Sequence, residues 1–190
     1  RPHEADQVLQ RIHQLVRAAR AAALPVLWVQ HEDPRPDHAL AHGCAGWAVH
    51  PAAGAEAQDV FIRKTTPDAF LRTGLADWLA TRGIGHLVVC GYATEYCVDT
   101  TTRRAAGLGL AVTLAADAHT THDKPHASGA LIRAHHNATL AELTSFGPTI
   151  RAVPVADIDL GDAAPRPSQT PHRVLDEGRL ATLYGQPSEA

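Results

Sequence analysis

Cys97 is the residue of this sequence whose type and position best fit a catalytic role. It follows an apolar, β-branched run from His86 to Cys90 and a turn led by glycine, and it stands where a helix is predicted to begin. Unpaired backbone N–H groups at a helix N-terminus carry partial positive charge, which favours the nucleophilic thiolate. A small buried side chain is the alternative role, and position alone does not decide between the two.

Two basic residues could act with Cys97, and each implies a different chemistry. Lys64 follows a short predicted strand, 59–62, and a lysine at that edge of a sheet would stabilise a thiolate or an oxyanion. Arg103 follows Cys97 at the spacing of phosphatases that hold phosphate between a cysteine and an arginine. The residues between them lack glycine and include Asp99, which would repel phosphate, so the phosphatase is the weaker hypothesis.

The thirteen histidines suggest a search for a metal site. Four of them share one predicted loop, at spacings that match no standard zinc pattern. These are His31, His38, His42 and His50. His119 and His122 follow the predicted end of a strand and could line a cleft. For each histidine a surface position or a structural hydrogen bond is the more common role.

The elements that must position these residues alternate between strands and helices. Apolar runs predict strands near residues 26–30, 59–62, 86–90, 110–116 and 149–155. Helical spacing and capping residues predict helices near residues 2–20, 73–82, 97–107 and 126–145. This alternation is typical of a parallel β-sheet with helices on both faces, a three-layer, Rossmann-like α/β fold. Such sheets carry their chemistry at the carboxyl ends of the strands.

Composition narrows the functional classes. The 190 residues suffice for one domain, and a net charge of -3 without a basic block argues against a nucleic-acid partner. No apolar run has the length of a membrane span, and three cysteines at unrelated spacings suit a reducing compartment. We therefore expect a cytoplasmic protein with no membrane partner. Because the composition shifts to Pro, Asp, Ser and Gln near residue 156, we expect a domain over 1–157 and a tail or arm over 158–190.

Three separated segments resemble one protein family. They read GYATEYCVDTT with the later AVTLAADAHTT, KTTPDAFLRTGLADWLATRGI, and LPVLWVQHED. In this order they resemble the isochorismatase-like cysteine hydrolases, which include isochorismatases, nicotinamidases, carbamoylsarcosine amidases and ureidoacrylate amidohydrolases. The resemblance covers about residues 5 to 155.

The resemblance implies an Asp–Lys–Cys triad that hydrolyses a small amide-, carbamoyl- or isochorismate-like substrate through a covalent thiol intermediate. Cys97 would be the nucleophile and Lys64 the lysine of the triad. A cis peptide bond is implied between Tyr92 and Ala93, and the amides of Ala93 and Cys97 would form the oxyanion hole. Trp47, Phe70, Tyr92 and Tyr96 would line the substrate pocket, although any of them could instead belong to the core.

The sequence departs from the family pattern in two places. The triad aspartate belongs to a first, central strand, whereas this chain opens on a helix, so we expect that strand to be absent from this chain and to precede Arg1. Nicotinamidases bind a metal through Asp-x-His, and here His31, Glu32 and Asp33 stand in the wrong order. We therefore predict no metal and no other cofactor. By analogy with the family we expect a homo-oligomer, a dimer or tetramer, and a non-catalytic binding or assembly domain is the alternative function.

Overall fold

The computed structural model describes residues 1–161, and its first element is a helix held to the sheet by an apolar stripe. Helix α1 (Ala5–Ala21) buries Val8, Ile12, Leu15 and Val16, which recur at helical spacing. The helix ends shortly before Pro25, whose ring and missing N–H are incompatible with a helix interior. The chain then enters the first strand.

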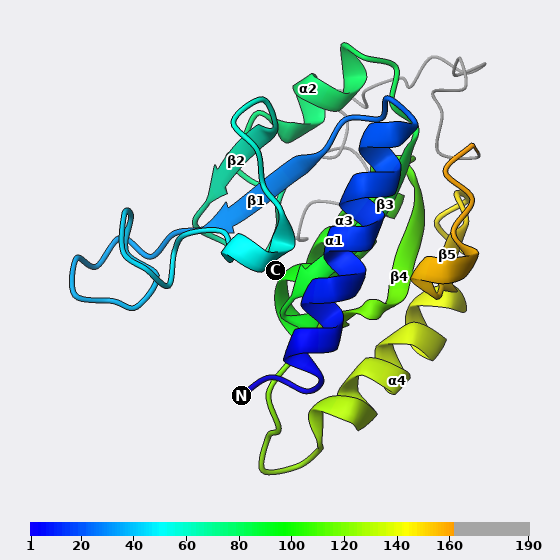
Figure 1. Cartoon of the computed structure of the whole chain (residues 1–190). Coiled ribbons are helices and arrows are strands. Elements are labelled where there is room, and N and C mark those ends of the chain that lie inside the picture. The colour runs from blue at the N-terminus through cyan, green and yellow to red at the C-terminus, as the bar shows by residue number, and fades with distance from the viewer. Residues whose placement is uncertain (162–190) are drawn as a thin grey trace, which may run out of the picture.

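The remaining elements alternate as the sequence predicts (Figure 1). They are β1 (Leu27–His31), the 3-10 turn η1 (Pro51–Ala53), β2 (Val60–Lys64), α2 (Leu75–Ala80), β3 (His86–Tyr92), the π-helical turn η2 (Thr94–Val98), α3 (Asp99–Gly107), β4 (Ala111–Thr120), α4 (Gly129–Ala141), β5 (Ile150–Val153) and the 3-10 turn η3 (Val155–Asp157). A long irregular connection joins β1 to β2 and contains one helical turn, as expected.

The parallel strands form two hydrogen-bonded groups. β1 pairs with β2, and β3, β4 and β5 pair in that order. Within residues 1–161 β1 and β3 are not hydrogen-bonded to each other, and this is the place at which the family resemblance puts the central strand expected to be absent. Only one edge of β3 is paired, and its residues are partly buried up to Gly91 and exposed at Tyr92.

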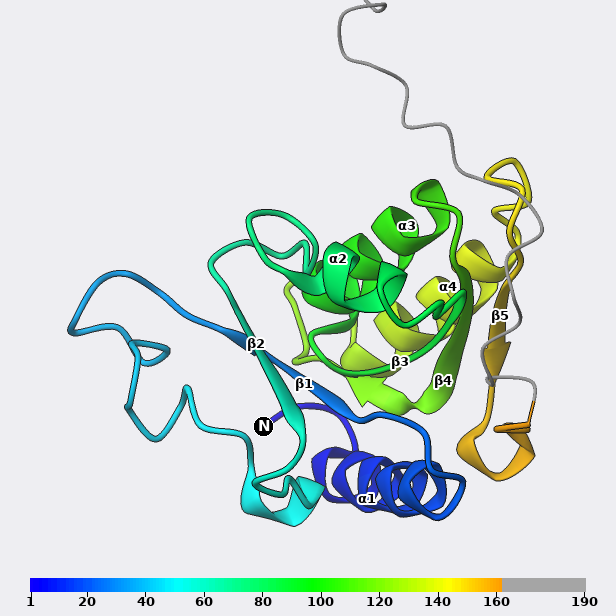
Figure 2. The same ribbon diagram turned by 90° about the horizontal axis from the view of Figure 1, so that it is seen from above.

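Helices cover both faces of the β3–β4–β5 group (Figure 2). α1 lies on one face, and α2, α3 and α4 lie on the other. Successive residues of a strand point to opposite faces. Accordingly Leu114 of β4 packs in the cluster beneath α2, α3 and α4, while Ala115 packs against α1. The prediction of a three-layer α/β fold is confirmed.

β4 runs four residues further than predicted, to Thr120. The reason is an irregularity that the sequence did not reveal. Gly91 of β3 pairs with His119, and four residues of β4, 115–118, lie opposite the single residue Cys90. After this bulge the pairing resumes, so β4 continues beside the end of β3.

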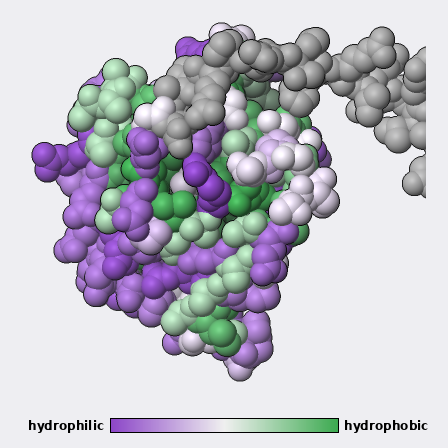
Figure 3. Space-filling model, turned by 90° about the vertical axis from the view of Figure 1, so that its right-hand side faces the viewer, coloured by the Kyte–Doolittle hydropathy of each residue, from purple (hydrophilic) through white to green (hydrophobic). Residues whose placement is uncertain are grey.

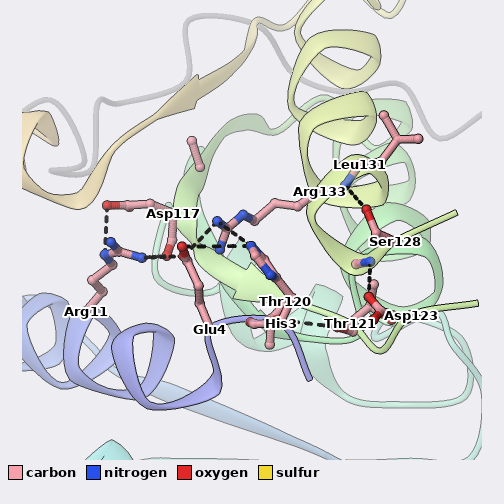
Figure 4. A network of polar contacts seen from close by, with 12 residues as sticks. His3, Glu4, Arg11, Asp117, Thr120, Thr121, Asp123, Ser128, Leu131 and Arg133 are labelled. Atoms are coloured by element: carbon pink, nitrogen blue, oxygen red, sulfur yellow. Dashed lines mark hydrogen bonds and ion pairs between the residues drawn. The ribbon is translucent and has the colours of Figure 1, made fainter. Parts of the chain in front are cut away.

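Polar side chains fasten the start of α1 to the ends of β4 and α4 (Figure 4). Glu4 accepts a hydrogen bond from Arg133 of α4 at 2.8 Å and lies 3.3 Å from Arg11 of α1. The backbone N–H of His3 donates to the carbonyl oxygen of Thr121 at 2.8 Å. The network holds three elements together beside the segment that joins β4 to α4.

α4 begins later than predicted because Ser128 caps it, its Oγ accepting from the backbone N–H of Leu131 at 3.2 Å. Beyond β5, Val155, Ile158 and Leu160 pack against the α1 cluster. Figure 3 shows the side of the molecule that carries β5, where apolar residues gather in the upper part and polar residues dominate the lower left. The tail predicted over 158–190 lies mostly outside the described residues. None of the helices within residues 1–161 has the length and apolar character needed to cross a membrane.

Candidate active site

The structure brings Lys64 and Cys97 into contact. Lys64 is the last residue of β2 and is buried, with 4% of its surface exposed. Its Nζ lies 3.0 Å from Sγ of Cys97 and 2.7 Å from the carbonyl oxygen of Thr66. Cys97 lies in η2, directly after β3. An ammonium group beside a sulfur favours the negatively charged thiolate, which is the nucleophilic form.

His31 completes the surroundings of the lysine. Its Nδ1 lies 3.3 Å from Nζ of Lys64. Burial and the neighbouring Lys64 charge lower the pKa of His31, so the ring is neutral at physiological pH. The sequence did not single out this contact. The contact follows from the strand register, because His31 and Lys64 are the last residues of two adjacent parallel strands and are paired with each other. Knowledge of this register would have predicted it.

The turn that carries Cys97 is closed by backbone hydrogen bonds. The peptide bond between Tyr92 and Ala93 is cis. The carbonyl oxygen of Ala93 then accepts from the N–H groups of Tyr96 at 3.1 Å and Val98 at 3.2 Å. Ala93 directly precedes η2 and Cys97 lies within it, so the two amides expected to form an oxyanion hole belong to one turn.

A buried polar chain runs behind this turn. Thr94 Oγ1 lies 2.9 Å from Nδ1 of His119, and Nε2 of His119 lies 2.8 Å from Oδ1 of Asn137. Thr94 and His119 are both fully buried. Burial lowers the pKa of His119 to about 4, so its ring is neutral. His119 lies within the longer β4 rather than after a strand end, so it does not line a cleft and has the structural, hydrogen-bonded role that was expected to be the more common one.

Two exposed tyrosines stand on the other side of the turn. The hydroxyl group of Tyr92 forms a hydrogen bond with Nδ1 of His122 at 3.0 Å. Nζ of Lys124 lies 5.1 Å from the ring centre of Tyr96. Lys124 also pairs with Glu95 at 3.1 Å. Burial opposes ionisation of Glu95, but hydrogen bonds from its own backbone, Thr121 and Lys124 lower its pKa.

A cavity of about 440 Å³ opens beside Tyr96, between η2 and α4. It is lined by Glu95, Tyr96, Lys124, His126, Ala127, Leu131, Ile132, His135 and His136. Of the four aromatic residues expected to line a substrate pocket, Tyr96 is the one in this lining.

Trp47 and Phe70 lie elsewhere. Phe70 is buried in the core cluster beneath α2, α3 and α4. Trp47 lies in the connection between β1 and β2, where its carbonyl oxygen accepts from the side chain of Gln30 at 3.1 Å and its ring meets that of His42 edge-on. Neither is placed against Cys97 by a contact that the structure records.

The alternative chemistries find little geometric support. Arg103 donates from Nε to both carboxylate oxygens of Asp99, at 2.9 and 3.0 Å, so its nearest anion is a residue of its own helix. Within residues 1–161, no three His, Cys, Asp or Glu side chains gather as metal ligands would. Lys64 and Cys97, by contrast, are in direct contact.

Comparisons with known proteins agree on one protein family. Residues 1–146 match the isochorismatase domain. A streptothricin hydrolase from Streptomyces noursei is 36% identical over 170 residues, which are 88% of this chain and 67% of that protein. A ureidoacrylate amidohydrolase from Methylorubrum extorquens is 33% identical over 124 residues, covering 50% of each chain. The chain thus spans two thirds of one curated relative and half of the other.

A solved structure shows the same fold. The crystal structure of a cysteine hydrolase from Pseudomonas syringae pv. phaseolicola superposes with a TM-score of 0.72 at 25% identity. The match covers 80% of this chain and 78% of that chain.

Proposed function

This chain belongs to the isochorismatase family, and from that premise we infer that it is a cysteine-dependent hydrolase of a small amide-, carbamoyl- or isochorismate-like compound. The observation that carries the proposal is the 3.0 Å contact between Lys64 Nζ and Cys97 Sγ. A buried lysine whose ammonium group touches a thiol is a means of keeping that thiol ionised and nucleophilic.

The proposed reaction has two stages. The thiolate of Cys97 attacks the electrophilic carbon, and the electron pair of the carbonyl moves to its oxygen, where the amides of Ala93 and Cys97 stabilise it. The C–N bond then breaks, its electron pair leaves with the nitrogen, and the leaving amine takes the proton that the thiol had lost. Water attacks the resulting thioester, releases the acid and restores the thiol. In the triad that the resemblance implies, an aspartate receives the thiol proton.

The substrate class is supported by the relatives. One is named a streptothricin hydrolase and one a ureidoacrylate amidohydrolase, at identities of 36% and 33%. The second name indicates cleavage of a C–N bond, and we therefore place amide and ureido compounds first among substrates to be tested. The expected cytoplasmic location and homo-oligomeric state remain predictions.

The experiment compares the three cysteines of one protein. Peptide mapping by mass spectrometry after brief iodoacetamide treatment at neutral pH gives a labelling rate for each. We expect Cys97 to label first and Cys90 last, because burial raises the pKa of the Cys90 thiol to about 11. Cys44 is the internal reference, since its Sγ only donates to the carbonyl oxygen of Ala39.

Turnover decides between a hydrolase and a non-catalytic binding domain. Hydrolysis of a panel of primary amides, ureido acids and vinyl ethers is measured for the wild type, Cys97→Ala and Cys44→Ala. The proposal requires that Cys97→Ala abolish turnover and that Cys44→Ala preserve it. If Cys97 labels no faster than Cys44 and its alanine variant leaves turnover unchanged, the cysteine-dependent hydrolase is wrong. If the wild type turns over none of the compounds, the non-catalytic binding domain is preferred.

A further inference from the structure

The polar chain behind the turn has a fixed hydrogen-bond direction. The amide nitrogen of Asn137 donates to the carbonyl oxygen of Ala116 at 2.9 Å. This contact orients the amide group, so its Oδ1 faces Nε2 of His119 as an acceptor. Nε2 of His119 must therefore carry the hydrogen.

The other ring nitrogen of His119, Nδ1, is then a hydrogen-bond acceptor. Because His119 is neutral and protonated at Nε2, its Nδ1 is bare. Thr94 must donate its hydroxyl hydrogen to Nδ1 across the 2.9 Å contact. The three residues come from α4, β4 and η2, and the direction of both hydrogen bonds between them is set by a backbone carbonyl on β4.

We propose that His119 and Asn137 are positioning residues for the reaction, acting through Thr94 to fix the turn whose amides stabilise the oxyanion. This inference rests on the proposed function. Thr94 lies directly after Ala93 and three residues before Cys97, so a rotation at Thr94 moves both amides. Oxyanion donors act only within a narrow range of distance and direction, and donors of this kind need a rigid support.

The surroundings fit this role. Thr94 and His119 have no exposed surface, so water does not compete for their hydrogen bonds. A second link to the end of β4 holds the same turn, since Thr121 Oγ1 donates to Glu95 at 2.9 Å. Two consecutive residues of the turn are thereby attached to β4 and to the residue that follows it. These hydrogen bonds do not involve the contact between Lys64 and Cys97, because Lys64 belongs to β2.

Two reagents distinguish the nucleophilicity of Cys97 from the stabilisation of the oxyanion by the turn. Iodoacetamide alkylates a thiolate without forming an oxyanion. 4-Nitrophenyl acetate acylates it through one: a new S–C bond forms, the ester C–O bond breaks, and 4-nitrophenolate leaves with the electron pair. A variant that misplaces the oxyanion amides alone should therefore slow acylation and spare alkylation.

The decisive variant is Thr94→Val, with Thr94→Ser as the rescue that keeps the hydroxyl group. We expect Thr94→Val to slow acetylation of Cys97 by about ten-fold or more and to change alkylation by less than about two-fold. Thr94→Ser should recover most of the acetylation rate. The matched control is Thr113→Val, which removes another Thr–His hydrogen bond, from the buried Thr113 to the partly buried His86 at 2.9 Å, at the opposite end of the same strands. It should leave both rates unchanged.

Each outcome has a defined meaning. If Thr94→Val slows both reactions equally, or slows neither, the positioning role is wrong. If wild-type Cys97 is neither acetylated nor needed for turnover, the proposed function fails and this inference falls with it. The tautomer is tested independently by 15N NMR of His119, which should show a proton on Nε2 and none on Nδ1; the opposite tautomer would overturn the inferred hydrogen-bond direction.

Discussion

The ammonium nitrogen of Lys64 lies 3.0 Å from the sulfur of Cys97, although the two residues stand 33 positions apart in the chain. β2 delivers the lysine and the turn after β3 delivers the cysteine, each at the carboxyl end of its strand. The ammonium group also contacts Thr66 O and His31 Nδ1, so its position is fixed from three sides.

Removing this ammonium group should make Cys97 less reactive. In Lys64→Met the sulfur loses its neighbouring positive charge, and we expect its alkylation by iodoacetamide at pH 7 to slow by about ten-fold or more. The matched control is Lys124→Met, which removes the same charge from a lysine bound to Glu95. Equal slowing in both variants would mean that overall charge, rather than the contact, controls the thiol.

Stability should fall as the pH is lowered from about 6.5 towards 4. The folded-state pKa of His119 is about 4 and the ordinary value is 6.5, so between these values the unfolded chain binds a proton that the folded chain does not. This group's contribution is fully present above pH 6.5 and is lost by pH 4, in total on the order of 3 kcal/mol.

The measurement is urea unfolding of the wild type and His119→Gln at pH 7.5, 6 and 4.5. Glutamine keeps a donor and an acceptor but does not titrate in this range. The free energy of unfolding of the wild type should therefore drop more steeply with falling pH than that of the variant. Parallel pH profiles would show that His119 is not responsible.

Helix α4 offers a matched pair of leucines for testing the core. Leu140 is completely buried among α3, β4 and β5, whereas Leu131 on the same helix is 59% exposed. We expect Leu140→Ala to lower the free energy of unfolding by about 2–5 kcal/mol, because it leaves a cavity. Leu131→Ala should change it by no more than about 0.5 kcal/mol. Similar losses in the two variants would contradict the described packing.

Asp117 joins α1, β4 and the segment after β5. Its Oδ1 accepts from the backbone N–H of Val155 at 2.9 Å, and its Oδ2 lies 3.2 Å from Nε of Arg11. Asp117→Ala leaves a backbone donor and a half-buried arginine without this partner, at an expected cost of about 1–3 kcal/mol in thermal or urea unfolding. Asp6→Ala, at an exposed pair with Arg1, should cost less than about 0.5 kcal/mol; a larger loss there than at Asp117 would refute this ranking.

The sequence predicted the elements well because their signals are local. The stripe of Val8, Ile12 and Leu15 defines α1 without reference to the rest of the chain. The bulge in β4 depends on pairing between distant segments, and no local pattern records it. The separation of β1 from β3 was expected from the family resemblance, which places a central strand between them.

The sequence predicted part of the candidate site. Cys97 and Lys64 could be named from strand ends and from the family segments. His31 and Asn137 could not, because their importance depends on which strand pairs with which and on which face of α4 meets β4. Phe70 looked like a pocket residue from its position in the chain, yet it is buried among α2, α3 and α4.

The bulge of β4 has a consequence for how this protein can vary through evolution. Residues 115–118 are three alanines and Asp117, and their number sets the position of His119 opposite Gly91. Side chains alternate along a strand, so the loss or gain of one residue here would turn His119 to the opposite face and away from Thr94. We therefore expect relatives that share the Thr94–His119 contact to differ in this segment by substitution, while insertions and deletions collect in the connection between β1 and β2.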